Sequence, residues 1–121
     1  MLDAGFAAAV IRTDGTVDIG RLTDALHASK SQLSYASGLS RDAISKTARL
    51  RAPATQARLR EMVEILNRVL PWCGSLPQAF AWYRSQPLPS FGDVTAEALV
   101  KRGRAEAVRE YLDRIAEGGY A

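Results

Sequence analysis

The sequence has little of what holds a domain together covalently or through a metal. It contains one cysteine, Cys73, and one histidine, His27. A domain stapled by disulfides needs paired cysteines, so we expect no disulfide framework. No apolar run approaches the roughly 18 residues of a membrane-spanning helix, and the apolar stretch 6–11 has no basic segment before it, unlike a signal peptide. These absences predict a cytoplasmic protein that does not enter a membrane.

Groups that converge in an active site are also scarce. Cys73 and His27 are far apart in the sequence, and neither an H-E-x-x-H motif nor a glycine-rich phosphate-binding loop occurs. Leu76 stands where a C-x-x-C redox motif has its second cysteine. An enzyme of this size needs a nucleophile with its base, a carboxylate pair or metal ligands. We therefore expect no catalytic site, no cofactor and no metal.

What the sequence does contain is helical periodicity. Its 121 residues and 47% hydrophobic content suit one domain, or two very small ones, with a core. Apolar residues share one side of a helix predicted over about 54–70, as core or as a dimer seam, and Pro71 is expected to end that helix. The members of this stripe are Leu59, Met62, Val63, Leu66 and Leu70.

Two interpretations fit the segment around Asp14 and Gly15. Asp-Gly between alternating apolar residues is a signal for a β-hairpin. Alternatively, the pair forms a turn that leads into a helix with Asp18 as its N-cap, since the apolar residues of 19–26 fall on one helical side. The sequence alone leaves both open.

A short helix, a glycine turn and a second helix are predicted between residues 31 and 46. Gly38 supplies the left-handed residue that ends the first helix, and Ser40 caps the second helix, which begins at Arg41. The pattern resembles the helix-turn-helix of DNA-binding proteins, in which the N-terminal residues of the second helix face base edges in the major groove. Ser37 departs from that motif, which usually has an apolar residue at this position.

Positive charge is concentrated in the same part of the chain. Residues 41–60 hold six basic side chains and one acidic side chain, Asp42, so this segment carries +5 while the whole chain carries +3. A solvated face is the commoner meaning of a charge run, but a basic patch on a helix-turn-helix indicates a polyanionic partner. Several side chains here suit phosphates and guanine edges. Those expected to contact operator DNA are Arg41, Ser45, Lys46, Arg49 and Arg51.

The C-terminal half is predicted to be a separate helical lobe. The proline-rich segment 86–90 suits a boundary between lobes. Ser75 is placed to cap a helix before this segment and Thr95 a helix after it, and Gly103 separates the latter from a last helix over about 104–117.

Opposite charges four residues apart should pair along the last helix, Arg109 with Asp113 and Glu110 with Arg114. Taken together, the predicted elements give an all-α fold: an N-terminal helix-turn-helix bundle over residues 1–72, followed by the small lobe over 73–121.

The last third of the chain also carries a series of residues at fixed spacings. They are Pro89-Ser90-Phe91-Gly92-Asp93-Val94-Thr95, Leu99-Val100, Gly103, Ala107-Val108, Leu112, Arg114-Ile115, Gly118 and Tyr120-Ala121. This series resembles the toxin-binding domain of Xre/MbcA/ParS-type antitoxins over about residues 75–121, and the upstream helix-turn-helix completes that family's order of parts. Two residues differ from that family's pattern: Asp93 stands where a second glycine is usual, and Ala96 stands where a proline often follows the threonine.

The resemblance implies an antitoxin of a type II toxin-antitoxin system, with 73–121 as its toxin-binding domain. Its partner would be a RES-domain toxin that consumes NAD, by degrading it or by transferring its ADP-ribose to a protein. The C-terminal end would cover the toxin's NAD pocket, the helix-turn-helix would bind the operator, and the chain would form a homodimer within the complex. The residues this implies at the toxin are Arg102, Arg104, Tyr111, Arg114, Gly118, Gly119, Tyr120 and Ala121.

Two interpretations stay open for the C-terminal residues, and two for the function of the chain. Gly118 and Gly119 either form a hinge that lets Tyr120 and Ala121 enter a narrow cleft of the toxin, or Gly118 is only a helix C-cap. The alternative function is a stand-alone DNA-binding transcriptional regulator whose C-terminal lobe dimerises.

Overall fold

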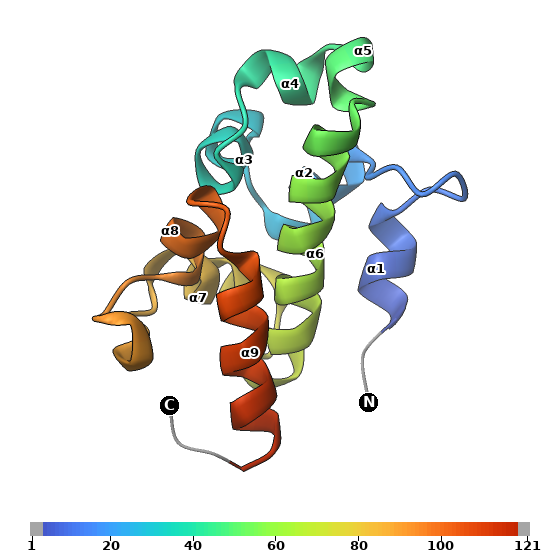
Figure 1. Cartoon of the computed structure of the whole chain (residues 1–121). Helices are drawn as coiled ribbons and strands as arrows, with labels where there is room; N and C mark the ends of the chain where they lie inside the picture. The colour runs from blue at the N-terminus through green and yellow to red at the C-terminus, as the bar shows by residue number, and fades with distance from the viewer. Residues whose placement is uncertain (1–3, 119–121) are drawn as a thin grey trace.

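The computed structural model describes residues 4–118, and this part of the chain is all-α, as predicted (Figure 1). Two isolated β-bridges, Ile11 with Val17 and Leu88 with Val94, accompany the helices. None of the described helices is both long and apolar enough to cross a membrane. The elements in chain order are α1 (Ala4–Val10), α2 (Ile19–Leu26), α3 (Lys30–Ser37), α4 (Arg41–Ser45), α5 (Thr47–Leu50), α6 (Pro53–Cys73), α7 (Leu76–Ser85), the 3-10 helix η1 (Pro89–Phe91), α8 (Ala96–Lys101) and α9 (Ala105–Ala116).

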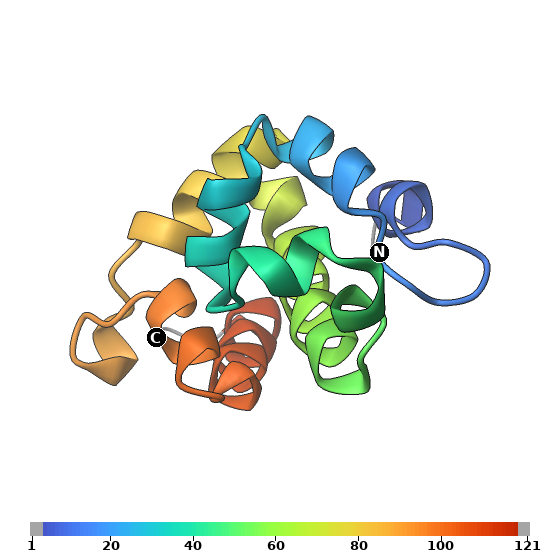
Figure 2. The same ribbon diagram turned by 90° about the horizontal axis from the view of Figure 1, so that it is seen from above.

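The long helix α6 runs through the middle of the molecule. The helices α1, α2, α3 and α7 curve around one side of it, and α9 lies along the other (Figure 1, Figure 2). The apolar stripe of α6 faces inward: Leu59, Met62, Val63 and Leu66 are buried, and Leu70 is partly buried. The stripe therefore belongs to the core of the chain and is not left free as a dimer seam.

One hydrophobic core runs through both predicted domains. It includes Phe6 of α1, Tyr83 of α7 and Leu112 of α9. Residues of 1–72 and of 73–121 thus bury each other's apolar surface, and such burial is the dominant favourable term in folding. The division into two functional parts stays a prediction.

Pro71 does not end α6, contrary to the prediction. The helix continues to Cys73 and is closed by Gly74, whose N–H donates to the carbonyl of Leu70 at 3.0 Å and whose φ is 93°. A proline harms a helix most in its interior, where it removes a backbone donor and crowds the carbonyl four residues earlier. Because Pro71 lies in the last turn, little helix remains beyond it to be disrupted, and the chain turns at the glycine.

The turn at Asp14 and Gly15 leads into a helix capped by Asp18, which confirms the second interpretation of this segment. Ile11 and Val17 form a single bridge and not the strands of a hairpin. The helix before this turn, α1, has no charged side chain between Ala4 and Val10 and was not predicted from the sequence.

The second helix of the predicted helix-turn-helix is shorter than expected. It ends at Ser45, Lys46 is extended with φ −96° and ψ 123°, and α5 begins at Thr47. Ile44 of α4 is buried and Leu50 of α5 packs against the core. On one continuous helix these two residues would point about 120° apart. The extended backbone at Lys46 lets both Ile44 and Leu50 reach the core. Two short helices therefore replace the single second helix that the sequence predicts.

Ion pairs hold α9 along α6. Arg109 Nε donates to Glu64 Oε1 at 2.9 Å, and Arg68 Nη2 donates to Asp113 Oδ1 at 2.7 Å. The predicted pair of Arg109 with Asp113 inside α9 is therefore wrong, because each side chain has a partner on the neighbouring helix. Local spacing favoured the pair within α9, but the packing of α9 on α6 supplies better placed partners.

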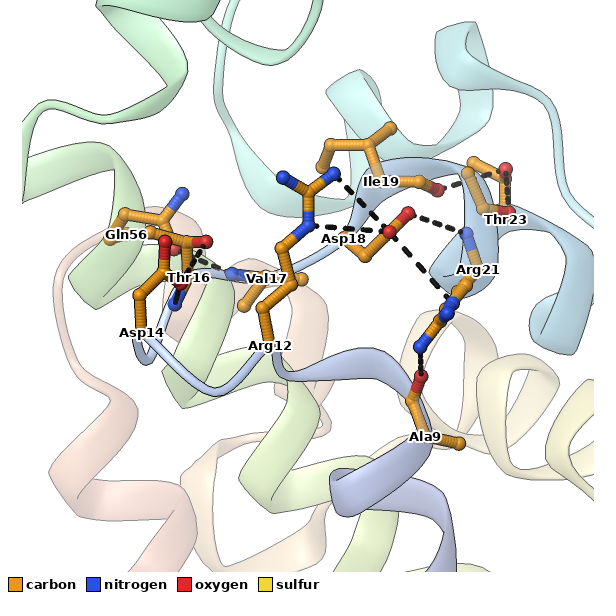
Figure 3. Close-up of polar contacts among 11 residues, drawn as sticks. Ala9, Arg12, Asp14, Thr16, Val17, Asp18, Ile19, Arg21, Thr23 and Gln56 are labelled. Atoms are coloured by element: carbon orange, nitrogen blue, oxygen red, sulfur yellow. Dashed lines mark hydrogen bonds and ion pairs between the residues drawn. The ribbon is translucent and has the colours of Figure 1, made fainter.

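The N-cap of α2 gives a testable dependence of stability on pH (Figure 3). Asp18 Oδ1 accepts a hydrogen bond from the N–H of Arg21 at 3.0 Å, and Oδ2 accepts one from Arg12 Nη2 at 3.2 Å. The backbone N–H of Arg21, and after it the guanidinium of Arg12, holds the pKa of Asp18 below its usual value. A carboxyl group with a lowered pKa in the folded state stabilises the fold above its unfolded pKa and loses that contribution as the pH falls through the folded pKa.

We expect Asp18→Ala to lower the free energy of unfolding at neutral pH by about 1 kcal/mol, the usual value of an N-cap. The difference from the native chain should shrink below about pH 4, where an unfolded aspartate begins to protonate. Urea unfolding at a series of pH values measures it, with Asp24→Ala in the same helix as the control. A loss that is independent of pH would contradict this role for the carboxylate.

Candidate functional site

The α3–α4 turn, residues 38–40, joins the two helices that resemble a helix-turn-helix. Gly38 ends α3 with φ 74°, and its N–H donates to the carbonyls of Ser34 at 3.0 Å and Tyr35 at 3.3 Å. Ser40 then caps α4 by accepting a bond from the N–H of Ala43 at 3.0 Å. Both features confirm the predicted helix, glycine turn and helix, since each comes from a residue whose local chemistry suits that position.

The remaining carbonyls at the end of α3 are satisfied by residues far away in the sequence. The last carbonyls of a helix lack partners within it. The buried hydroxyl of Tyr83 in α7 donates to the carbonyl of Ala36 at 2.9 Å, and Arg58 Nη1 in α6 donates to the carbonyl of Ser37 at 2.8 Å. The α3–α4 turn is therefore fixed by α6 and α7 as well as by its own residues.

Ser37, which departs from the motif, is accommodated inside the turn. Its side chain is fully buried, and its hydroxyl donates to the carbonyl of Ser34 and accepts from the N–H of Leu39, both at 3.2 Å. A buried hydroxyl without partners would destabilise the fold. With both bonds made, serine replaces an apolar residue here without leaving an unpaired group.

The predicted DNA-contacting residues lie on α4 and α5 or directly beside them in the sequence, and these two helices are at one end of the molecule (Figure 1). All of them are exposed, and we call them the basic surface: Arg41, Ser45, Lys46, Arg49 and Arg51. They come from two helices and not from one. Asp42 lies among them, 3.8 Å from Lys46 Nζ and 3.7 Å from Arg49 Nη1. Since these pairs are exposed, they reduce the local charge while contributing little to stability.

Two other arginines of the charged segment have structural partners. Arg58 pairs with Glu61 at 3.5 Å in addition to its bond to α3, and Arg60 donates to the carbonyl of Gly15 at 3.3 Å. The charge available to a partner thus comes mainly from α4 and α5.

Four residues predicted at the toxin lie on α9 or directly beside its ends. Tyr111 and Arg114 are three residues apart on the helix, Arg104 precedes its first residue, and Gly118 follows its C-terminal end. We call them the α9 stripe. Phe91 of η1 joins part of it: its ring centroid is 6.2 Å from that of Tyr111 and 5.9 Å from the guanidinium of Arg104.

The members of the α9 stripe differ in exposure. Tyr111 is only 8% exposed, so its ring belongs to the core and a partner meets at most its edge. Arg114 is exposed and, within residues 4–118, makes no ion pair with Glu110 or any other side chain. Gly118 has φ 84°, a conformation that both a C-cap and a hinge require. The remaining predicted residues Gly119, Tyr120 and Ala121 lie outside the described part of the chain.

Arg102 lies before α9, two residues from Arg104 at the N-terminal end of the α9 stripe. It follows α8 and precedes the turn at Gly103, and its neighbour Lys101 packs on the end of α3. The 12 residues of α9 span about 18 Å, so Arg102 and Gly118 are near opposite ends of that helix. The structure does not bring Arg102 together with the C-terminal end.

Two exposed aromatic side chains carry no role in the sequence analysis. Tyr35 on α3 is 62% exposed and Trp72 at the end of α6 is 53% exposed. The ion pairs between α6 and α9 each join residues 45 apart, so the two helices run in the same direction. Trp72 is in the last turn of α6, at the end that lies toward the C-terminal end of α9, and it is not a member of the apolar stripe of α6.

Metal-ligating side chains do not gather in the part of the chain that the structure describes. Between residues 4 and 118, no three His, Cys, Asp or Glu side chains are placed to hold a metal. Burial raises the pKa of the Cys73 thiol, which disfavours the reactive thiolate.

Comparison of the chain with protein-family models, with curated proteins and with solved structures finds no match.

The bond from Tyr83 to Ala36 leads to a prediction for the α3–α4 turn. Tyr83→Phe keeps the buried ring and removes the hydroxyl, which leaves the carbonyl of Ala36 unpaired in the core. We expect the free energy of unfolding to fall by about 1–3 kcal/mol, the cost of an unsatisfied buried group. Tyr35→Phe makes the same chemical change at an exposed site and is the control. Equal unfolding midpoints in urea for the two variants would contradict this role for the hydroxyl.

Proposed function

We propose that this chain is the antitoxin of a type II toxin-antitoxin pair whose toxin is a RES-domain protein that consumes NAD. The observation that supports this most is the α9 stripe. Tyr111 and Arg114 lie one turn apart on α9, Arg104 precedes the helix, and the ring of Phe91 from η1 is 6.2 Å from that of Tyr111. Arg104 and Arg114 stay exposed, and within residues 4–118 Arg114 makes no ion pair, so its guanidinium is available to a partner.

The proposed partner surface runs down α9 to its C-terminal end. Arg104 and Arg114 offer guanidinium groups suited to bidentate bonds with carboxylates, and exposed arginine and tryptophan are frequent anchors of protein interfaces. Trp72, exposed in the last turn of α6, is proposed to enlarge the apolar part of this surface. Beyond Gly118, residues 119–121 are proposed to cover the NAD pocket of the toxin and so to block its substrate.

The same chain is proposed to bind operator DNA through the basic surface. Arg41 and Ser45, on the short helix α4, would face base edges, and Lys46, Arg49 and Arg51 would contact phosphates. The basic surface and the C-terminal end of α9 are at opposite ends of the molecule (Figure 1). Toxin and DNA would therefore not compete for one surface, as autoregulation by a toxin-antitoxin complex requires.

The toxin-binding role is tested with the RES-domain protein that co-purifies with the chain from its host. NAD consumption by that protein is measured against increasing concentrations of antitoxin. Deletion of residues 119–121, or Arg114→Ala, should raise the concentration needed for half inhibition by about tenfold or more, which corresponds to about 1.4 kcal/mol.

Arg41→Ala removes the same charge at the other end of the molecule and should inhibit as well as the native chain. Full inhibition by the deletion variant would contradict the covering mechanism. Recovery of the chain without any NAD-consuming protein would contradict the antitoxin assignment and favour a stand-alone DNA-binding regulator.

A further inference from the structure

The exposed side of α3 carries a contact from α4. Ser31 and Tyr35 are four residues apart and lie on the same side of α3. Arg41, the first residue of α4, donates a hydrogen bond from Nη1 to Ser31 Oγ. The basic surface therefore continues from α4 onto α3, one helical turn away from the exposed ring of Tyr35.

The C-terminal half brings further cations to this side of α3. Lys101 Nζ is 3.5 Å from the centroid of the Tyr35 ring, and the guanidinium of Arg84 is 5.6 Å from it. A Cβ added at Gly38 would lie 3.2 Å from Lys101 Cγ, so the end of α8 is packed directly on the α3–α4 turn. We call these three side chains, together with Arg102, which follows Lys101 at the end of α8, the α3–α8 seam: Tyr35, Arg84, Lys101 and Arg102.

The seam has an excess of positive charge. Its acidic neighbour is Glu97, which is 8% exposed, accepts a hydrogen bond from Arg84 Nε at 3.0 Å and forms an ion pair with Lys101 Nζ at 3.7 Å. One carboxylate thus holds two cations in place. Arg102 adds a third cation, which is exposed and has no ion pair among the described residues.

Cations beside an exposed tyrosine fit the phosphate backbone of nucleic acid, to which arginine, lysine and tyrosine side chains commonly bond. In a helix-turn-helix the first helix crosses the DNA backbone while the second enters the major groove. Here α3 is the first helix, and the seam lies on it. Resting on the proposed DNA-binding function, we infer that the α3–α8 seam contacts the backbone of the duplex that α4 and α5 bind, so that the C-terminal half takes part in DNA binding.

This inference assigns Arg102 to DNA and not to the toxin. It is tested on the full chain by fluorescence anisotropy with a labelled mixed-sequence duplex of about three helical turns, at several salt concentrations. Each phosphate contact contributes about 0.9 to the slope of log K against log salt. Arg102→Ala should weaken binding several-fold and lower the slope by about that amount. Tyr35→Ala should weaken binding without changing the slope, because tyrosine carries no charge.

Arg114→Ala is the matched control, since it removes an exposed, unpaired arginine at the other end of α9. Circular dichroism confirms that each variant is folded.

Lys46→Ala reports on the proposed basic surface itself. If it lowers the slope while Arg102→Ala behaves like Arg114→Ala, the seam inference fails and the DNA-binding function stands. A native chain that binds no duplex overturns both. Loss of toxin binding in Arg102→Ala with an unchanged slope makes the seam a protein surface and overturns the inference.

Discussion

The rest of the structure depends on how the last backbone carbonyls of α3 find hydrogen-bond donors. A helix leaves its last carbonyls without partners inside the helix, and here the end of α3 lies against the core, where water cannot serve them all. The buried Tyr83 hydroxyl and the Arg58 guanidinium supply the missing donors from α7 and α6. Because a buried carbonyl without a donor is costly, the α3–α4 turn can take this position only when α6 and α7 are folded beneath it.

This constraint connects the two proposed surfaces. The basic surface follows directly from the α3–α4 turn, and the α9 stripe runs along the same core to its opposite end. Between them, the pairs of Arg109 with Glu64 and of Arg68 with Asp113 set the position of α9 along α6. Exposed ion pairs contribute little energy, so they fix position while buried apolar residues supply most of the stability. DNA and a protein partner would thus bind to one framework and not to two independently moving lobes.

The features that sequence predicted well are those decided by neighbouring residues. Caps and glycine turns are local, and the structure confirms those at Asp18, Ser40, Ser75, Thr95, Gly38 and Gly103. The break at Lys46 and the passage of α6 through Pro71 depend on packing, which local propensity does not contain. The partner of Arg109 is 45 residues away. For the candidate site, sequence predicted the charge of α4 and α5, but it grouped Arg102 with residues at the far end of α9 and gave Tyr35 no role.

Native-state hydrogen exchange tests most directly whether the two surfaces share one framework. Amides in regions that open together exchange with the same free energy of opening. The slowest amides of α3, α6, α7 and α9 are predicted to exchange with a common free energy, equal to that of global unfolding. If the amides of α9 exchange through an opening of much lower free energy while those of α3 and α6 stay protected, the C-terminal half is an independent lobe and the account is contradicted.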